Sequence, residues 1–86
     1  MDSMERLRAF QAVAKETSFS KAANRIYRTQ PAVSQAVKAL ELELGERLFL
    51  RRGRVIALTQ AGRILLEDFG AGLHLSRPGQ KENFGP

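Results

Sequence analysis

The stretch SFSKAANRIYRTQPAVSQAVKALELEL, residues 18–44, determines the fold that this chain is predicted to adopt. Hydrophobic residues recur at helical spacing on both sides of a break at residues 27–30, which predicts a short helix, a tight corner and a longer helix. The longer helix carries one hydrophobic stripe, formed by Val33, Val37, Leu40 and Leu44. Two helices joined in this way form a helix-turn-helix.

The polar face of the longer helix carries side chains that suit the reading of DNA bases. An ordinary solvated face alternates Glu and Lys, whereas these first turns offer Gln30, Ser34 and Gln35, which both donate and accept hydrogen bonds. Such groups match the base edges in the major groove. The alternative is a helix pair of a small domain whose polar outer face has no function.

Length and composition narrow the classes of protein that fit. The chain has 86 residues, enough for one small domain, and a formal charge of +5, which favours polyanionic partners. It has no cysteine and a single histidine, His74, so the sequence predicts no metal site and no cofactor. No segment resembles a signal peptide or a membrane span, and we therefore expect a cytoplasmic protein with no membrane partner.

The flanking residues predict where the helices begin and end. A first helix is expected from Met4 to Thr17. Ser18 or Ser20 can cap the second helix and Thr29 the third, because their side chains accept bonds from free backbone N–H groups. Glycine suits the left-handed position at the end of the third helix, at residue 45. Tyr27, at the corner, is expected to pack at the rim of the core.

Residues 46–58, ERLFLRRGRVIAL, predict a β-hairpin. Two short hydrophobic strands flank a turn that contains Gly53. Arg51, Arg52 and Arg54 lie at its tip, and arginine suits both a narrow minor groove and phosphate groups. The alternative is a solvated loop whose charges only improve solubility.

A fourth helix is predicted from Thr59, which can cap it, to residue 75. Ala61, Ile64 and Leu65 are expected to return to the core. A second stripe, formed by Leu66, Phe69 and Leu73, exceeds what one small domain covers and predicts a dimer interface. Residues 76–86 are polar and rich in Pro and Gly, so a flexible tail is expected.

Contacts to DNA are expected from the two-helix unit and from the hairpin. The free N–H groups at the N-terminus of a helix can bind a phosphate, and Arg28, at the corner between the second and third helices, can reach one. On the longer helix, which would be the recognition helix, Pro31 can contact a thymine methyl group, and Lys38 can bind guanine or phosphate. The residues predicted to contact DNA are Ser18, Ser20, Lys21, Arg28, Thr29, Gln30, Pro31, Ser34, Gln35, Lys38, Arg51, Arg52 and Arg54.

The segments SFSKAA, TQPAVSQAVKALE, LGERLF and LTQAG occur together and in this order. In this combination they resemble the N-terminal domain of the LysR-type transcriptional regulators, over residues 4–69. The resemblance implies a mainly α fold with a small β-hairpin: a winged helix-turn-helix over residues 1–58, a linker and dimerisation helix over 59–75, and a tail over 76–86. It also implies a sequence-specific, non-enzymatic regulator. The third helix, about 30–44, would enter the major groove and the wing, 51–54, the minor groove.

The resemblance further implies a homodimer on double-stranded DNA with a partly palindromic operator. Gln35 departs from the family pattern, since many relatives have arginine there, and this weakens the assignment of guanine or phosphate recognition at that position. The family also has a C-terminal effector-binding domain with no counterpart in this chain. We therefore expect a DNA-binding fragment or truncated product, in preference to a naturally short regulator, and a small-molecule effector would act only through the absent domain. The alternative function is a winged-helix module for protein–protein association.

Overall fold

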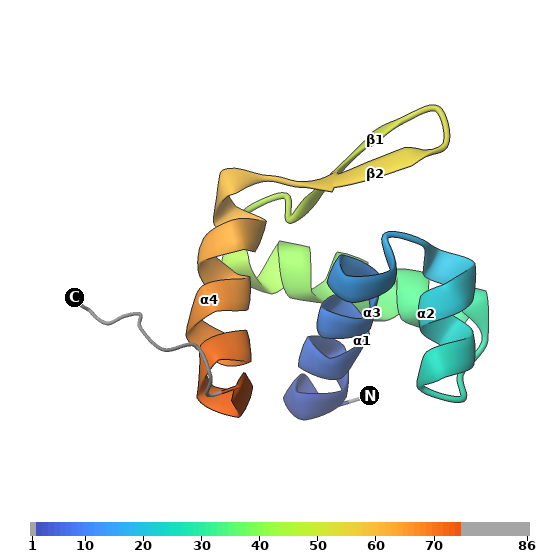
Figure 1. The fold of residues 1–86 in the computed structure, drawn as a ribbon, viewed down its shortest axis with the longest axis horizontal. Helices are drawn as coiled ribbons and strands as arrows, with labels where there is room; N and C mark the ends of the chain where they lie inside the picture. The colour runs from blue at the N-terminus through green and yellow to red at the C-terminus, as the bar shows by residue number, and fades with distance from the viewer. Residues whose placement is uncertain (1, 75–86) are drawn as a thin grey trace.

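The computed structural model describes residues 2–74, and for residues 70–74 it describes the backbone alone. The elements are α1 (Ser3–Glu16), α2 (Phe19–Arg25), α3 (Gln30–Leu44), β1 (Phe49–Arg52), β2 (Val55–Leu58) and α4 (Gln60–His74) (Figure 1). The two strands pair antiparallel. This architecture confirms the expected fold class, mainly α with a small hairpin. The tail predicted to be flexible, 76–86, lies outside the described residues.

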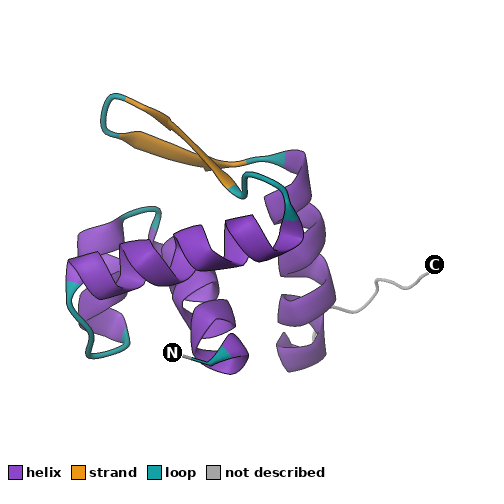
Figure 2. Cartoon of the chain, turned by 180° about the vertical axis from the view of Figure 1, so that it is seen from behind, coloured by secondary structure: helices purple, strands orange, loops and turns teal. Residues whose placement is uncertain are grey.

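The helices form a compact body over which the hairpin projects. α1 packs against both α2 and α3, and α4 lies at the end of α3 that leads into the hairpin (Figures 1 and 2). From its base beside α4, the hairpin extends along α3 toward α2. The recognition helix predicted from sequence and the wing therefore lie next to each other.

The core lies where α1 crosses the helix-turn-helix. Its largest fully buried side chains are Phe10, Val13, Val33 and Leu48. Small residues fill the contacts between helices and allow the backbones to approach closely. These residues are Ala9, Ala12, Ala22, Ala23 and Ala36.

The ends of the helices follow the local signals in the sequence. The hydroxyl oxygens of Ser18, Thr29 and Thr59 each accept a bond from the backbone N–H three residues later, at 3.0–3.2 Å. Gly45 ends α3 with a φ of 72°, in the left-handed region that favours glycine. The predicted caps at Thr29 and Thr59 and the predicted glycine at the end of α3 are confirmed, and Ser18 rather than Ser20 is the cap of α2. The first helix begins and ends one residue before the predicted Met4 and Thr17.

Two packing positions predicted within the helix-turn-helix are wrong. Leu44 is 47% exposed, because it is the last residue of α3 and the buried residues of that helix end at Leu40. Tyr27 is 91% exposed instead of packing at the rim. Its φ of 57° turns the chain sharply at the corner, and the side chain projects into solvent.

The hydrophobic face of α4 is rotated from the predicted one by the contact at Gly62. This glycine is buried, and a Cβ there would overlap the backbone oxygen of Leu48. Because Gly62 faces the body, residues four and seven positions later face it too. Leu66, predicted to be uncovered, packs against the core, and Phe69 is half-buried. Ile64, predicted to be in the core, is 53% exposed.

Replacing Gly62 with alanine should destabilise the fold. The added methyl group gains about 1 kcal/mol of helix propensity, but overlap with a backbone oxygen costs more, so we expect a net loss of about 1–3 kcal/mol in the free energy of unfolding. Urea denaturation measures the change. Gln60→Ala, an exposed position in the same helix, is the matched control and should stay within about 0.5 kcal/mol of wild type. A Gly62→Ala chain more stable than wild type would mean that the close approach does not exist.

Candidate nucleic-acid interface

The first turns of α3 present most of the side chains predicted to read bases. Gln30, Pro31, Gln35 and Lys38 are exposed, and Ser34 is half-buried. They lie opposite the buried stripe of the helix. Proline at the second position of α3 disrupts no helical hydrogen bond, since the first N–H groups of a helix have no partner within it.

The N-terminal part of α2 supports this face. Ser20 Oγ donates a hydrogen bond to Gln30 Oε1 at 3.2 Å, which restricts the rotamers of Gln30 and leaves its amide nitrogen free to donate. Ser18 accepts the backbone N–H of Lys21 at 3.1 Å, and the side chain of Lys21 is exposed. Two of the three serines predicted to contact DNA therefore also have a structural role: Ser18 caps α2, and Ser20 orients the Gln30 side chain.

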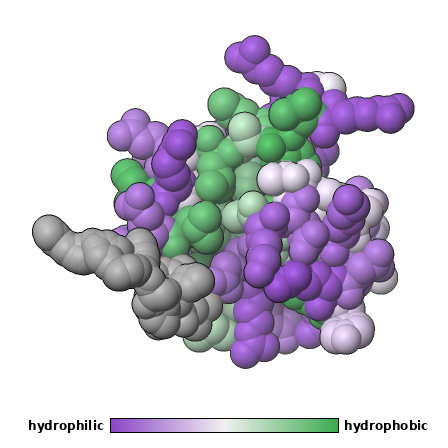
Figure 3. All heavy atoms as spheres, in the orientation of Figure 1, coloured by the Kyte–Doolittle hydropathy of each residue, from purple (hydrophilic) through white to green (hydrophobic). Residues whose placement is uncertain are grey.

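The hairpin carries exposed arginines at and beside its turn. Arg51 pairs with Ile56 and Arg52 with Val55, while Arg54 lies within the turn. Successive side chains of a strand point to opposite faces, so Arg51 and Arg52 diverge. Hydrophilic side chains project from the hairpin, and hydrophobic ones gather nearer its base and α4 (Figure 3).

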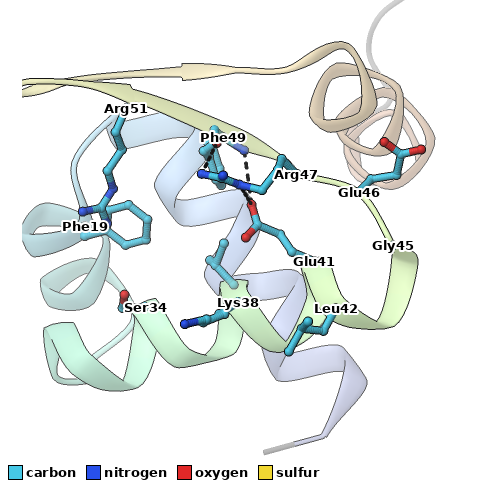
Figure 4. Close-up of a pocket in the computed structure, with 11 residues that line it drawn as sticks. Phe19, Ser34, Lys38, Glu41, Leu42, Gly45, Glu46, Arg47, Phe49 and Arg51 are labelled. Carbon is cyan, nitrogen blue, oxygen red and sulfur yellow. Dashed lines mark hydrogen bonds and ion pairs between the residues drawn. The ribbon is translucent and has the colours of Figure 1, made fainter.

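Arg51 contacts α2. Its guanidinium carbon lies 4.3 Å from the centroid of the Phe19 ring, a cation–π contact that braces the strand against the N-terminus of α2 (Figure 4). Phe19 itself is 7% exposed and packs edge-on against Phe49. Of the three arginines predicted to contact DNA from the hairpin, Arg51 is thus engaged with Phe19, while Arg52 and Arg54 are exposed at and beside the turn.

Arg28 lies at the corner and pairs with a helix outside the helix-turn-helix. Its Nη2 is 3.1 Å from Glu5 Oε1 of α1, and both side chains are substantially exposed. An exposed ion pair contributes little to stability, so this arginine can exchange its partner for a phosphate at small cost. The next residue, Thr29, caps α3.

A groove of about 630 Å³ lies between α3 and β1. Three of the predicted DNA-contact residues line it: Ser34, Lys38 and Arg51. The groove also contains a carboxylate, Glu41, and Figure 4 shows it directed from α3 to the residues that enter β1. Residues of both the predicted recognition helix and the predicted wing therefore line one groove.

Glu41 is the residue of this region that sequence reasoning missed. Its Oε2 accepts the backbone N–H of Leu48 at 2.8 Å and that of Phe49 at 3.4 Å, and lies 3.8 Å from Nε of Arg47. The Glu41 side chain is only 17% exposed. One signal was present: a carboxylate in the last turn of a helix opposes the helix dipole, and such a placement suggests a compensating partner.

The predicted dimer residues fall into two groups. Leu66 and Phe69 are half-buried, with Leu66 against the core, and the side chain of Leu73 lies outside the described residues. Exposed hydrophobic side chains occur elsewhere on α4 and on the hairpin, at Ile64 and Val55. The dimer interface stays a prediction, as do the individual DNA contacts.

Residues 2–74, which the structure describes, also bear on two other classes of site. In that part of the chain no group of three or more His, Cys, Asp or Glu residues is placed to hold a metal ion. Among its helices, none combines the length and the apolar character needed to cross a membrane.

Comparison with protein families gives a match over most of the chain. Residues 4–63 match the bacterial regulatory helix-turn-helix proteins of the lysR family. One similar protein is an uncharacterized HTH-type transcriptional regulator from the ibpB-leuC intergenic region of Azotobacter vinelandii, 57% identical over 60 residues, which are 70% of this chain and 42% of that protein. The chain spans 18% to 42% of the length of the similar curated proteins compared with it.

Solved structures of DNA-binding domains are also similar to this chain. A crystal structure of the CbnR DNA-binding domain in complex with DNA has a TM-score of 0.76 and 39% identity, over 87% of this chain and 85% of that one. The BenM DNA-binding domain in complex with catB site 1 DNA has a TM-score of 0.77 and 36% identity, over 85% of this chain and 80% of that one. Both neighbours were solved with DNA bound.

Proposed function

This chain belongs to the LysR family of bacterial regulatory helix-turn-helix proteins and has the fold of their DNA-binding domains, not that of an enzyme; from this premise we propose that it recognises a specific, partly palindromic double-stranded operator. The observation that carries the proposal is the joint exposure of the first turns of α3 and of the arginine hairpin on either side of one groove. A regulator that binds the chromosome of a bacterium acts in the cytoplasm, and we include that location in the proposal.

In this proposal α3 lies in the major groove. A major groove about 12 Å wide admits one helix, and the donors and acceptors of its base pairs distinguish all four of them. Gln30 is suited to adenine because its amide both donates and accepts, and the bond from Ser20 holds it in place before binding. Ser34 and Lys38 follow Gln30 at intervals of four residues, about one helical turn, and Lys38 adds a charge for guanine or phosphate. Gln35 lies beside this row, one turn after Pro31.

The hairpin lies on the neighbouring minor groove in the same proposal. Arginine is attracted into narrow minor grooves by their enhanced negative potential. Arg52 and Arg54 project from the tip, while Arg51 is stacked on Phe19 and supports the strand. Contacts of this kind supply affinity and register, whereas α3 supplies most of the base discrimination.

We further propose that two copies bind together through α4. One recognition helix reads only a few base pairs, but two helices related by a two-fold axis read half-sites about one helical turn, roughly 34 Å, apart. α4 stands at the edge of the body, where a second copy can reach it (Figure 1). Its exposed Ile64 and its half-buried Phe69 provide hydrophobic surface for such a contact.

Selection of bound duplexes from a random library tests the proposal directly. We expect enrichment of a motif with two inverted half-sites, because a symmetric dimer presents the same recognition helix twice. Sequencing of the bound fraction measures this. An enriched single half-site would refute the dimer but keep the base recognition. No binding to any duplex at low salt would instead support the alternative function, a module for protein–protein association.

Two substitutions should separate base reading from phosphate binding. Gln30→Ala should reduce discrimination at one base pair of each half-site by about 1–3 kcal/mol, because a bidentate contact is lost. Arg52→Ala should weaken all sequences alike and lower the slope of log K against log salt by about 1 per copy. Fluorescence anisotropy titrations over a salt series measure both.

The matched control for the charge change is Arg8→Ala. Arg8 is exposed on α1, where it lines one pocket with Gln11 and Arg25 and another with Arg28, and it is not among the predicted DNA contacts. Its loss should leave both the discrimination and the salt slope near wild type. If Gln30→Ala kept full discrimination while Arg8→Ala lost it, the assignment of the reading face to α3 would be wrong.

A further inference from the structure

We propose that Glu41 is a positioning residue that holds the hairpin at its place beside α3 and thereby determines how much the hairpin arginines contribute to DNA binding. The proposal rests on the proposed function. It concerns a residue that carries the wrong charge for DNA and yet lies between the two surfaces predicted to bind it (Figure 4).

The carboxylate connects the end of α3 to the start of β1. Its Oε2 accepts the N–H groups of Leu48 and Phe49, at 2.8 and 3.4 Å, and these two residues are 0% and 4% exposed. The backbone oxygen of Glu41 accepts the N–H groups of Gly45 and Glu46, at 2.8 and 3.2 Å. One residue therefore holds both the turn that ends α3 and the segment that enters the hairpin.

The same segment is held from its other side by the start of α4. The Thr59 N–H donates to Leu48 O at 3.0 Å, and the Thr59 hydroxyl donates to Arg47 O. Residues 47–49 are thus fixed between α3 and α4, and Glu41 provides the attachment to α3. Without it, the base of the hairpin keeps its link to α4 and loses its polar link to the recognition helix.

Electrostatics and positioning predict opposite effects when the carboxylate is removed. A carboxylate near DNA repels phosphate, so its loss by itself raises the positive potential and strengthens binding. Loss of a positioning contact weakens binding, because the arginines at the tip no longer meet the DNA backbone in register with α3. The sign of the change therefore distinguishes the two roles.

The test measures binding of the 86-residue chain to the duplex enriched by the wild type and to a random-sequence duplex. Glu41→Ala should weaken binding to the enriched duplex about five- to tenfold, and Arg52→Ala should weaken it about fivefold in the wild-type chain but less than about twofold in the Glu41→Ala chain. That non-additivity is a readout that a general loss of stability does not produce at a temperature where all variants are folded.

Three further variants make the result decisive. Glu43→Ala removes the same charge from an exposed position of α3 that pairs with Arg6, and should leave binding unchanged or tighten it up to about twofold. Glu41→Gln keeps an acceptor oxygen and should retain most of the binding. Glu41→Met keeps the length of the side chain without an acceptor oxygen, and it replaces Glu41→Ala if that chain does not fold. Circular dichroism and thermal unfolding verify the fold of each chain.

The proposal is overturned if Glu41→Ala, or Glu41→Met where Glu41→Ala does not fold, binds at least as tightly as Glu43→Ala while the loss caused by Arg52→Ala remains fivefold as in the wild type. A wild-type chain that binds no duplex would refute the proposed function itself. The two failures are therefore distinguishable.

Discussion

The packing of the Phe49 ring is the contact on which the arrangement of helices and wing depends. This residue begins β1, is 4% exposed, and its ring centroid lies 5.4 Å from that of Phe10 and 6.2 Å from that of Phe19. Aromatic pairs in tilted or edge-on geometry contribute about 0.5–1.5 kcal/mol beyond the burial of their area. α1, α2 and β1 therefore meet at one side chain, and the hairpin can project over α3 because its base is anchored in the core.

Two polar contacts then orient β1 relative to α3 and α2. Glu41 joins the entry of β1 to α3, and Arg51 stacks on the outer side of Phe19. In both contacts a charged side chain binds a group of the protein itself: Glu41 binds backbone N–H groups, and Arg51 binds an aromatic ring. In the proposed function, the surface left for DNA consists of the first turns of α3 and the arginines at the hairpin tip. The chain belongs to the LysR family, and two similar structures were solved with DNA bound.

Sequence reasoning predicts the elements of this fold well because their ends are decided locally. A cap such as Thr29 or a terminal glycine such as Gly45 acts within one turn of its own helix, and both are found as expected. Which face of a helix is buried depends on contacts between distant segments. The predictions for Ile64 and Leu66 were wrong because the close approach of Gly62 to the Leu48 backbone sets the buried face of α4. The contacts of Glu41 and Arg51 join positions up to 32 residues apart, and no periodic pattern reveals them.

The central claim is that α3 and the hairpin tip contact one duplex together. Chemical-shift mapping of the backbone amides, titrated with the enriched duplex, tests it most directly. The account predicts that the largest shifts fall on residues 30–38 and 51–54, with small ones along the outer face of α1. Shifts confined to α1 and the exposed corner at Tyr27, with α3 and the hairpin unchanged, would contradict it.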